Sequence, residues 1–236
     1  MTDRLLVTGG SSGIGRAIAD RGINAGWDVT VIDRDPAPIG RGIIADLADR
    51  ESTAVALKEA LADGPVTRLV NNVGAVFPNS FDEQTLNEFD ASYELNLRSA
   101  VQATQAVIPG MKDQGFGRIV NMSSRASLGK ERRSAYAAAK AGLIGLTRVW
   151  ALELGPSGIT VNAVGPGPIA TDLFLKANPA DSEQTKRIIS GIPVGRLGTT
   201  EDIAYVTEFF LGAEAGFVTG QVLYACGGLT VGVAPI

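Results

Sequence analysis

The sequence predicts an α/β protein built on a doubly wound parallel sheet, and two observations support this. Short apolar runs rich in Val, Ile and Leu recur without strict alternation, as expected of strands that are buried on both faces. Segments with helical periodicity separate these runs, and that order of elements produces a parallel sheet covered by helices.

In the first half of the chain, β-branched or apolar runs predict strands, and glycines commonly stand at the turns between elements. The segment 48–64 carries Val55, Leu57 and Leu61 on one helical face and ends at a glycine. The predicted elements are, in order, a strand at 4–8, a helix at 14–26, strands at 28–33 and 42–46, a helix at 48–64 and a strand at 68–74.

In the second half the alternation continues, with one exception. The predicted elements are a long helix near 93–114, a strand at 117–124, a helix at 134–155, a strand at 159–164, a helix at 201–212 and a strand at 221–225. The stretch 165–196 is rich in Pro and Gly and weakly periodic, so we expect it to be mostly loop.

Composition restricts the classes of function. The chain has 236 residues, 45% of them hydrophobic and 19% charged, which fits one domain over 1–236. A net charge of −4 argues against a nucleic-acid or polybasic membrane surface, and no apolar run could span a bilayer. The N-terminus lacks a signal-peptide pattern. We therefore expect a cytoplasmic protein with a small-molecule substrate.

Cysteine and histidine usage points the same way. Cys226 is the only cysteine, so no disulfide forms within the chain, which suits a reducing compartment. Without histidine or cysteine pairs the sequence offers no metal site of the zinc type, and we predict none.

The stretch "TGGSSGIG" (8–15) lies between the first predicted strand and the first predicted helix. Backbone N–H groups at a helix N-terminus bind anions, and a bulky side chain would keep a pyrophosphate away from them. Gly9, Gly13 and Gly15 therefore fit a cradle for dinucleotide phosphates. Their spacing is not the general G-x-G-x-x-G, so a glycine-rich turn without a ligand is the alternative.

Asp33 ends the second predicted strand, 18 residues after Gly15. A carboxylate at this point can accept hydrogen bonds from the hydroxyls of an adenosine ribose. Arg34 would tolerate a 2′-phosphate, but the Asp33 carboxylate repels that phosphate more directly. We therefore predict NAD as the preferred cofactor with NADP as the alternative, while a solvated acid is the other interpretation of Asp33.

The chain contains no histidine, so another group must carry protons near neutral pH. Tyr136 and Lys140, in "SAYAAAK" (134–140), share one face of a predicted helix. Tyrosine has an ordinary pKa of about 10, and a nearby ammonium group or an oxidised nicotinamide favours the phenolate. The pair predicts a general acid/base, although the same spacing also arises on helices by chance.

Two further polar residues are candidates for the same site. Ser124 ends the strand before this helix, where its hydroxyl can reach the substrate oxygen that Tyr136 protonates, whereas Ser123 alternates to the other face. Asn96 lies inside the long predicted helix, and a buried polar side chain there requires a specific partner.

Several motifs occur in a fixed order along almost the whole chain. After the glycine loop come "NNVG" (71–74), "LNLRSA" (95–100), "NMSS" (121–124), "YAAAK" (136–140), "VNAVGPGPIATDL" (161–173), "GRLGTTEDIA" (195–204) and "VTGQVLYACGG" (218–228). Each motif is weak alone, but the ordered set is specific. The chain resembles the short-chain dehydrogenase/reductase family, close to its 3-oxoacyl-[acyl carrier protein] reductase-like branch.

The resemblance implies a single-domain Rossmann fold with a seven-stranded parallel sheet, helices on both faces and a nicotinamide cofactor. It implies that Tyr136 is the acid/base and that Ser124 orients and polarises the substrate oxygen. Lys140 would bind the nicotinamide ribose and lower the pKa of the tyrosine, and Asn96 would hold a water that links Lys140 to solvent.

The resemblance also places residues around the cofactor. Asp46 and Leu47 would flank the adenine, Asn72 and Gly74 the adenosine-side ribose, and Ile169 and Thr171 the nicotinamide amide. The remaining cofactor residues are Gly9, Ser11, Ser12, Gly13, Ile14, Gly15, Asp33, Arg34, Tyr136, Lys140, Pro166 and Gly167. Family members are mostly tetramers, so we expect a homotetramer formed through the helices near 93–114 and 134–155 and the C-terminal strand region.

The leading interpretation is an NAD(P)(H)-dependent oxidoreductase that interconverts a secondary alcohol and a ketone by hydride transfer. An alternative is a 3-oxoacyl-[acyl carrier protein] reductase of fatty-acid synthesis, which would usually require NADPH. A non-catalytic dinucleotide-sensing protein need not retain Tyr136, Lys140 and Ser124 together, and the glycine loop argues against a ligand-free structural oligomer.

The stretch "KERR" (130–133) is the departure from the family with the clearest consequence, since the interval from Ser124 to Tyr136 is also one residue shorter than the family's. The shorter loop should bring Arg133 inward, where a guanidinium can hold a carboxylate bidentately. We expect Lys130 and Arg132 to stay in solvent. The substrate residues would be Ser124, Arg133 and Pro168, with a preference for anionic substrates; a solvated charged loop is the alternative.

Overall fold

The computed structural model describes residues 3–231, and within them seven parallel strands form one sheet in the order β3-β2-β1-β4-β5-β6-β7. The order reverses at β1, and such a reversal is where open α/β sheets bind ligands. The Rossmann fold is confirmed. The strands are β1 (Arg4–Thr8), β2 (Asp28–Asp33), β3 (Arg41–Ile44), β4 (Arg68–Asn71), β5 (Gly117–Met122), β6 (Ile159–Val164) and β7 (Val222–Leu223).

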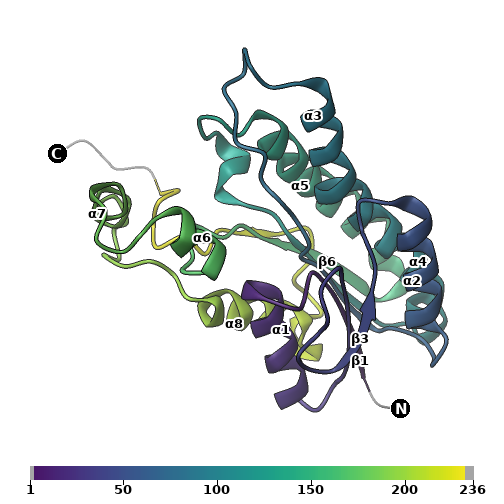
Figure 1. Ribbon diagram of the computed structural model, residues 1–236. Helices are drawn as coiled ribbons and strands as arrows, with labels where there is room; N and C mark the ends of the chain where they lie inside the picture. Colours follow the sequence, from purple (N-terminus) through teal and green to yellow (C-terminus); the bar gives the residue numbers. More distant parts are fainter. Residues whose placement is uncertain (1–2, 232–236) are drawn as a thin grey trace.

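Helices cover both faces of this sheet (Figure 1). On one face lie α1 (Gly13–Asn24) and α8 (Thr200–Leu211), and on the other lie α2 (Arg50–Leu61), α4 (Ser99–Gln114) and α5 (Ser134–Leu154). Successive strand residues alternate between the two layers: Leu6 and Leu69 pack towards α2, α4 and α5, and Val7 and Val70 towards α1 and α8. Both strand faces are therefore apolar, as the sequence predicted.

The long helix predicted near 93–114 consists of three elements. It begins earlier as α3 (Leu86–Tyr93), passes through a π-helical turn at Glu94–Arg98, and continues as α4. Thr85 and Glu88 form a capping box that starts α3. A π-helical turn changes which side chains share a face, and such turns often occur at functional sites. Asn96 lies within this turn.

The expectation that 165–196 is mostly loop is wrong in part, because this stretch contains α6 (Asp172–Ala177) and α7 (Glu183–Ser190). Each helix begins at a hydroxyl side chain that caps it: Thr171 accepts from the N–H of Phe174, and Ser182 from the N–H of Thr185. Helices this short carry too few apolar positions to show a period. In Figure 1 they lie beyond the sheet edge, apart from the main helical layers.

The strand register brings the site together. Asn71 pairs with Asn121 and Met122 with Val164, so the carboxyl ends of β4, β5 and β6 lie side by side. Predicted strands that extended past these points, at 68–74 and 117–124, end earlier because the chain turns into the loops of the site. None of the described helices is long and apolar enough to cross a membrane, and residues 1–2 and 232–236 of the predicted domain lie outside the described part.

Candidate functional site

The loop between β1 and α1 accepts only glycine at several positions. A Cβ atom added to Gly15 would lie 2.1 Å from the carbonyl oxygen of Gly9, and one added to Gly9 would lie 2.8 Å from the Cα of Val73. Gly9 and Gly13 also have left-handed backbones, with φ of 69° and 54°. At these positions the loop therefore has no side chains to cover its backbone N–H groups, as a phosphate-binding loop requires.

The N-terminus of α1 has hydrogen-bond donors for a ligand. Ser12 stands at its N-cap but makes no side-chain cap hydrogen bond, whereas Asp49 caps α2 and Thr199 caps α8. The first N–H groups of a helix have no partner inside the helix. A Cβ atom added to Gly13 would lie 3.5 Å from Thr171, which begins α6 on the opposite side of the loop. Donors and space both fit a dinucleotide pyrophosphate.

The Asp33 carboxylate is fixed at the end of β2, next to this loop. It accepts hydrogen bonds from the backbone N–H groups of Ser11, at 2.9 Å, and Asp35, at 3.4 Å. The Arg34 side chain is 83% exposed, and its Nε lies 3.7 Å from the Asp35 carboxylate. The carboxylate is thus held where a ribose would lie, and the guanidinium faces solvent and another acid.

The residues expected around the adenosine differ in whether their side chains or only their backbone groups can contact it. The Leu47 side chain is buried in the core, which leaves only its backbone for an adenine, and the exposed Asp46 carboxylate accepts from the N–H of Ala48 at 2.9 Å. The Asn72 amide donates to the carbonyl oxygens of Thr8, at 3.0 Å, and Gly9, at 2.8 Å. Asn72 therefore ties the loop after β4 to the glycine loop.

The segment after β6 is held by its neighbours. The carbonyl oxygen of Pro166 accepts from the N–H of Arg125, and the N–H of Gly167 donates to Ala225, both at 3.0 Å. The half-buried Pro168 accepts from the N–H of Gly198 at 3.0 Å. Because the Ile169 side chain is buried in the core, only its backbone can meet a nicotinamide amide.

Asn96 has the specific partners that its burial predicted. Its amide donates to the carbonyl oxygens of Ala75, at 2.9 Å, and Ser92, at 3.0 Å, and its Oδ1 accepts from the N–H of Ala75 at 3.2 Å. A Cβ atom added to Gly74 would lie 2.5 Å from this Oδ1 and 3.0 Å from the Nζ of Lys140. The π-helical turn thus brings Asn96 and Lys140 together across Gly74.

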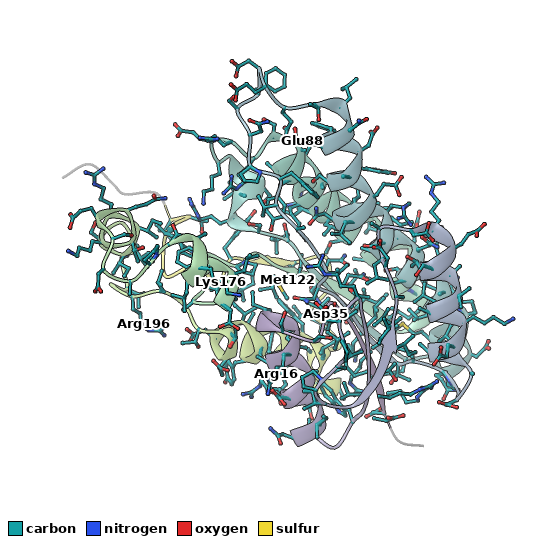
Figure 2. The ribbon with its side chains drawn as sticks, viewed as in Figure 1. Arg16, Asp35, Glu88, Met122, Lys176 and Arg196 are labelled. Atoms are coloured by element: carbon teal, nitrogen blue, oxygen red, sulfur yellow. The ribbon has the colours of Figure 1, made fainter. Side chains whose placement is uncertain are left out.

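Lys140 is only 2% exposed, and its Nζ donates to the carbonyl oxygen of Met122 at 2.9 Å. Met122 is the last residue of β5 and lies near the centre of the molecule (Figure 2). Ser123 returns the contact, donating from its hydroxyl to the carbonyl oxygen of Lys140 at 2.9 Å. Burial lowers the pKa of Lys140 to about 8.

The Ser124 hydroxyl lies beside Tyr136, where it lowers the pKa of the phenol, and the Nζ of Lys140 lies 5.7 Å from the centre of the tyrosine ring. The expectation that Lys140 lowers the tyrosine pKa stays a prediction. Burial raises the pKa of Tyr136, and the groups that oppose this are the Ser124 hydroxyl and the Arg133 guanidinium.

Sequence reasoning missed two residues that position the catalytic loop and helix. The Gln84 side chain accepts from the N–H of Ala135 at 3.2 Å, in the first turn of α5. The Tyr224 hydroxyl lies 3.2 Å from that of Ser127, and the Tyr224 ring would lie 2.4 Å from a Cβ atom on Gly165. Both contacts join segments far apart in the sequence, so no local pattern indicates them.

The burial of Lys140 predicts a pH dependence of stability. Its pKa is about 8 in the folded protein against an ordinary 10.5, so between these values the unfolded chain binds a proton that the folded chain does not. We expect the free energy of unfolding of the parent, relative to Lys140→Met, to rise across this range by at most about 1.4 kcal/mol per pH unit.

Urea unfolding of both proteins at closely spaced pH values measures this difference. Below pH 8 the difference should be constant, because the lysine is then protonated in both states. A difference that stays flat up to pH 10.5 would show that the lysine keeps its ordinary pKa.

Known proteins resemble this chain in sequence and in fold over almost its whole length. The family model described as enoyl-(acyl carrier protein) reductase matches residues 9–230. Acetoacetyl-CoA reductase of Shinella zoogloeoides is 39% identical, with 94% of this chain and 96% of that protein covered. 3-Oxoacyl-[acyl-carrier-protein] reductase FabG of Haemophilus influenzae is 36% identical, with 95% and 96% covered. The crystal structure of a blue fluorescent protein from a metagenomic library, in complex with NADPH, matches with a TM-score of 0.88 at 34% identity, covering 97% of this chain and 98% of that one.

Proposed function

Given that the chain belongs to the short-chain dehydrogenase/reductase family, as an NAD(P)-dependent oxidoreductase acting on CH–OH and keto groups, we propose that Tyr136 is its general acid/base and NAD its preferred cofactor. The observation that carries the catalytic assignment is the position of Tyr136 beside the Ser124 hydroxyl and the buried Lys140, whose Nζ lies 5.7 Å from the centre of the tyrosine ring. In a chain without histidine, this phenol is the side chain best placed to exchange a proton with a substrate oxygen.

In the direction of alcohol oxidation, the substrate hydroxyl lies between Ser124 and Tyr136. Ser124 holds the oxygen, and the phenolate form of Tyr136 accepts its proton. A bound nicotinamide supplies the hydride acceptor, or the donor in the reverse direction. The positive charge of Lys140 favours the phenolate form of Tyr136. Hydrogen bonds with Met122 and Ser123 hold Lys140 in its buried position, which keeps its charge beside the tyrosine ring.

Asn96 supports this site in two ways in our proposal. Its side chain fixes Ala75 through donor and acceptor contacts, which keeps Gly74 against Lys140. One lone pair of its Oδ1 remains beside Lys140, which suits a water that passes protons between the lysine and solvent.

The preference for NAD rests on the loop after β2. Asp33 is fixed by two backbone N–H groups and would lie against a 2′-phosphate, while the Arg34 side chain is directed to solvent and Asp35. The similar blue fluorescent protein was solved with NADPH, which favours the other cofactor. NADP is therefore the alternative for this chain.

We expect kcat/KM with NAD to exceed that with NADP at least tenfold, which corresponds to ~1.4 kcal/mol of discrimination. Asp33→Ala should narrow this gap, because the carboxylate that repels the 2′-phosphate is removed. Initial rates with both cofactors, measured for the two proteins on one alcohol, provide the comparison. An equal or higher kcat/KM with NADP in the parent would overturn the preference and assign the phosphate to Arg34.

The substrate we propose is a small-molecule ketone or secondary alcohol. Two relatives are named for the reduction of acetoacetyl-CoA and of 3-oxoacyl-(acyl carrier protein), so a 3-oxoacyl thioester is the second candidate. It is weakened by Asp33, since that reduction usually requires NADPH.

A homotetramer in the cytoplasm completes the proposal. The side chains of Val149 and Leu152 on α5 are 47% and 80% exposed, which leaves apolar surface on a helix that family members use for assembly. The single cysteine, Cys226, is free, as suits a reducing compartment.

A further inference from the structure

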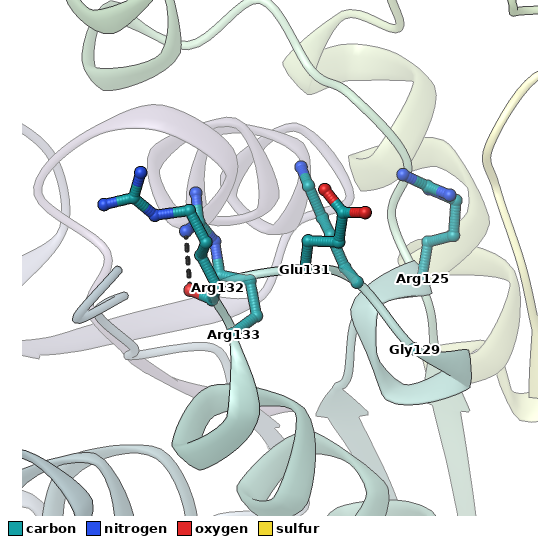
Figure 3. A pocket seen from close by; sticks show the side chains of 6 residues that line it. Arg125, Gly129, Glu131, Arg132 and Arg133 are labelled. Carbon is teal, nitrogen blue, oxygen red and sulfur yellow. Dashed lines mark hydrogen bonds between the residues drawn. The ribbon is translucent and has the colours of Figure 1, made fainter. Parts of the chain in front are cut away.

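An open surface cavity of about 590 Å³ lies along the loop that joins Ser124 to Tyr136 and is not used by the mechanism above (Figure 3). Its lining comes from one loop, which begins with the residue after Ser124 and ends three residues before Tyr136. The lining residues are Arg125, Gly129, Lys130, Glu131, Arg132 and Arg133. The sequence predicted an inward position for Arg133, and this residue is half-buried; Lys130 and Arg132 are exposed, as expected, and line the same cavity.

The cavity is strongly basic in a chain that is acidic as a whole. Its lining carries four cationic side chains and one carboxylate, whereas the chain has a net charge of −4. Within residues 3–231, none of these four cations forms an ion pair, although Arg21 and Arg196 elsewhere do. Figure 3 shows the side chains on the side of the loop that faces away from α5.

The cations repel one another in the protein as it stands. Burial lowers the pKa of Lys130, and the charges of Arg133 and Arg125 lower this pKa further. The Arg132 backbone has φ of 58°, the one left-handed conformation of a residue other than glycine in the described chain. Strain of this kind is retained where a loop has a function.

The cavity also lies within reach of the reaction. The Arg133 guanidinium is close enough to Tyr136 to lower the pKa of the phenol. The N–H of Arg125 is hydrogen bonded to Pro166, in the segment that follows β6. The cavity therefore adjoins Tyr136 through Arg133 and the segment after β6 through Arg125.

We propose that this basic cavity binds the anionic group of the substrate, a carboxylate or a phosphate, and so selects charged ketones and alcohols over neutral ones. The proposal rests on the proposed function of Tyr136 and names the substrate class for that site. Arg133 holds the anion next to the reacting carbon through a bidentate contact, while Lys130 and Arg125 neutralise its charge. Binding energy from this remote group orients the substrate for hydride transfer.

The first test compares 3-hydroxybutyrate with its methyl ester, and 3-hydroxybutyryl-coenzyme A with the corresponding N-acetylcysteamine thioester. The proteins are the parent, Arg133→Ala, Lys130→Ala and, as a control that removes a positive charge from α2, Lys58→Ala. We expect kcat/KM of at least one charged substrate to fall about tenfold more than that of its neutral partner in the two cavity variants. A lower kcat/KM for 3-hydroxybutyrate indicates that the cavity binds a carboxylate. A lower kcat/KM for the coenzyme A ester indicates that it binds a phosphate.

In the control variant Lys58→Ala, the ratio of kcat/KM for each charged substrate to kcat/KM for its neutral partner should equal that of the parent. Equal losses for charged and neutral substrates in Arg133→Ala would show that the arginine only supports Tyr136, and this would overturn the proposal. A parent that prefers the neutral substrates in both pairs would overturn it too.

A second measurement does not depend on turnover. Calorimetric titration of the parent with malonate at low ionic strength should show binding that weakens at least about tenfold in Arg133→Ala but not in Lys58→Ala. No difference between parent and cavity variant would refute the basic site even if catalysis by Tyr136 is established. Malonate binding together with full activity of Tyr136→Phe would instead leave the site in place and remove the proposed function.

Discussion

Replacing Tyr136 with Phe lowers turnover by at least ~100-fold, the low end of the contribution of general acid/base catalysis. The change removes one hydroxyl from a partly buried ring and leaves the packing around it in place. Cofactor affinity should therefore stay near that of the parent, because the glycine loop and Asp33 lie on other elements. Steady-state rates measure the turnover of the variant, and a titration of cofactor binding measures its cofactor affinity.

The pattern of the two results separates catalysis from folding. A variant that loses both turnover and cofactor affinity would indicate a disturbed site, and the conservative change would then have a structural effect. Near-normal turnover in a well-folded variant would remove Tyr136 from the mechanism.

The second large effect is expected at Ser124, with Ser123 as its natural control. Ser124→Ala removes the hydroxyl beside Tyr136 that we propose holds the substrate oxygen, so turnover should fall by ~100-fold or more. Ser123→Ala loses only the hydrogen bond to the carbonyl oxygen of Lys140, which should cost about 1 kcal/mol of stability with little change in kcat.

Rates and unfolding curves for the two variants decide between the serines. If Ser123→Ala were the slower enzyme and Ser124→Ala the mild one, the catalytic hydroxyl would have been assigned to the wrong face of the strand end.

The sheet and its helical layers could be predicted because their signals are local. Runs such as 4–8 and 159–164 are apolar on both faces, and the glycines of 9–15 stand directly after a strand. The catalytic helix was equally clear, since Tyr136 and Lys140 are related by helical spacing alone. The order of the strands within the sheet was not predicted, because no local pattern contains it.

What the sequence did not predict depends on contacts between distant segments. Arg68 looks like an exposed strand-end charge, but it is 3% exposed, bonds to the carbonyl oxygen of Leu211 and lies over the Trp27 ring. The π-helical turn at Asn96 arises where α3 meets α4, and its amide contacts come from Ala75 and Ser92. Neither arrangement has a periodic signature.

The pKa of Tyr136 could not be predicted either, because it is a balance of opposing effects. Spacing indicates a nearby lysine, whose charge should lower the tyrosine pKa, but burial acts in the opposite direction and dominates. Burial also lowers the pKa of Lys140 to about 8, which weakens its charge at alkaline pH. The loop arginine, Arg133, proves to be the cation that lowers the phenol pKa.

The pH dependence of a single turnover of alcohol oxidation, in the parent and in Tyr136→Phe, tests the central claim most directly. The phenolate is the base, so the rate constant of the parent should rise with pH and level off once Tyr136 has ionised. The residual rate of Tyr136→Phe should lack that ionisation and change little over the same range. A variant that retains both the rise and its apparent pKa would show that another group accepts the proton, and would contradict the assignment.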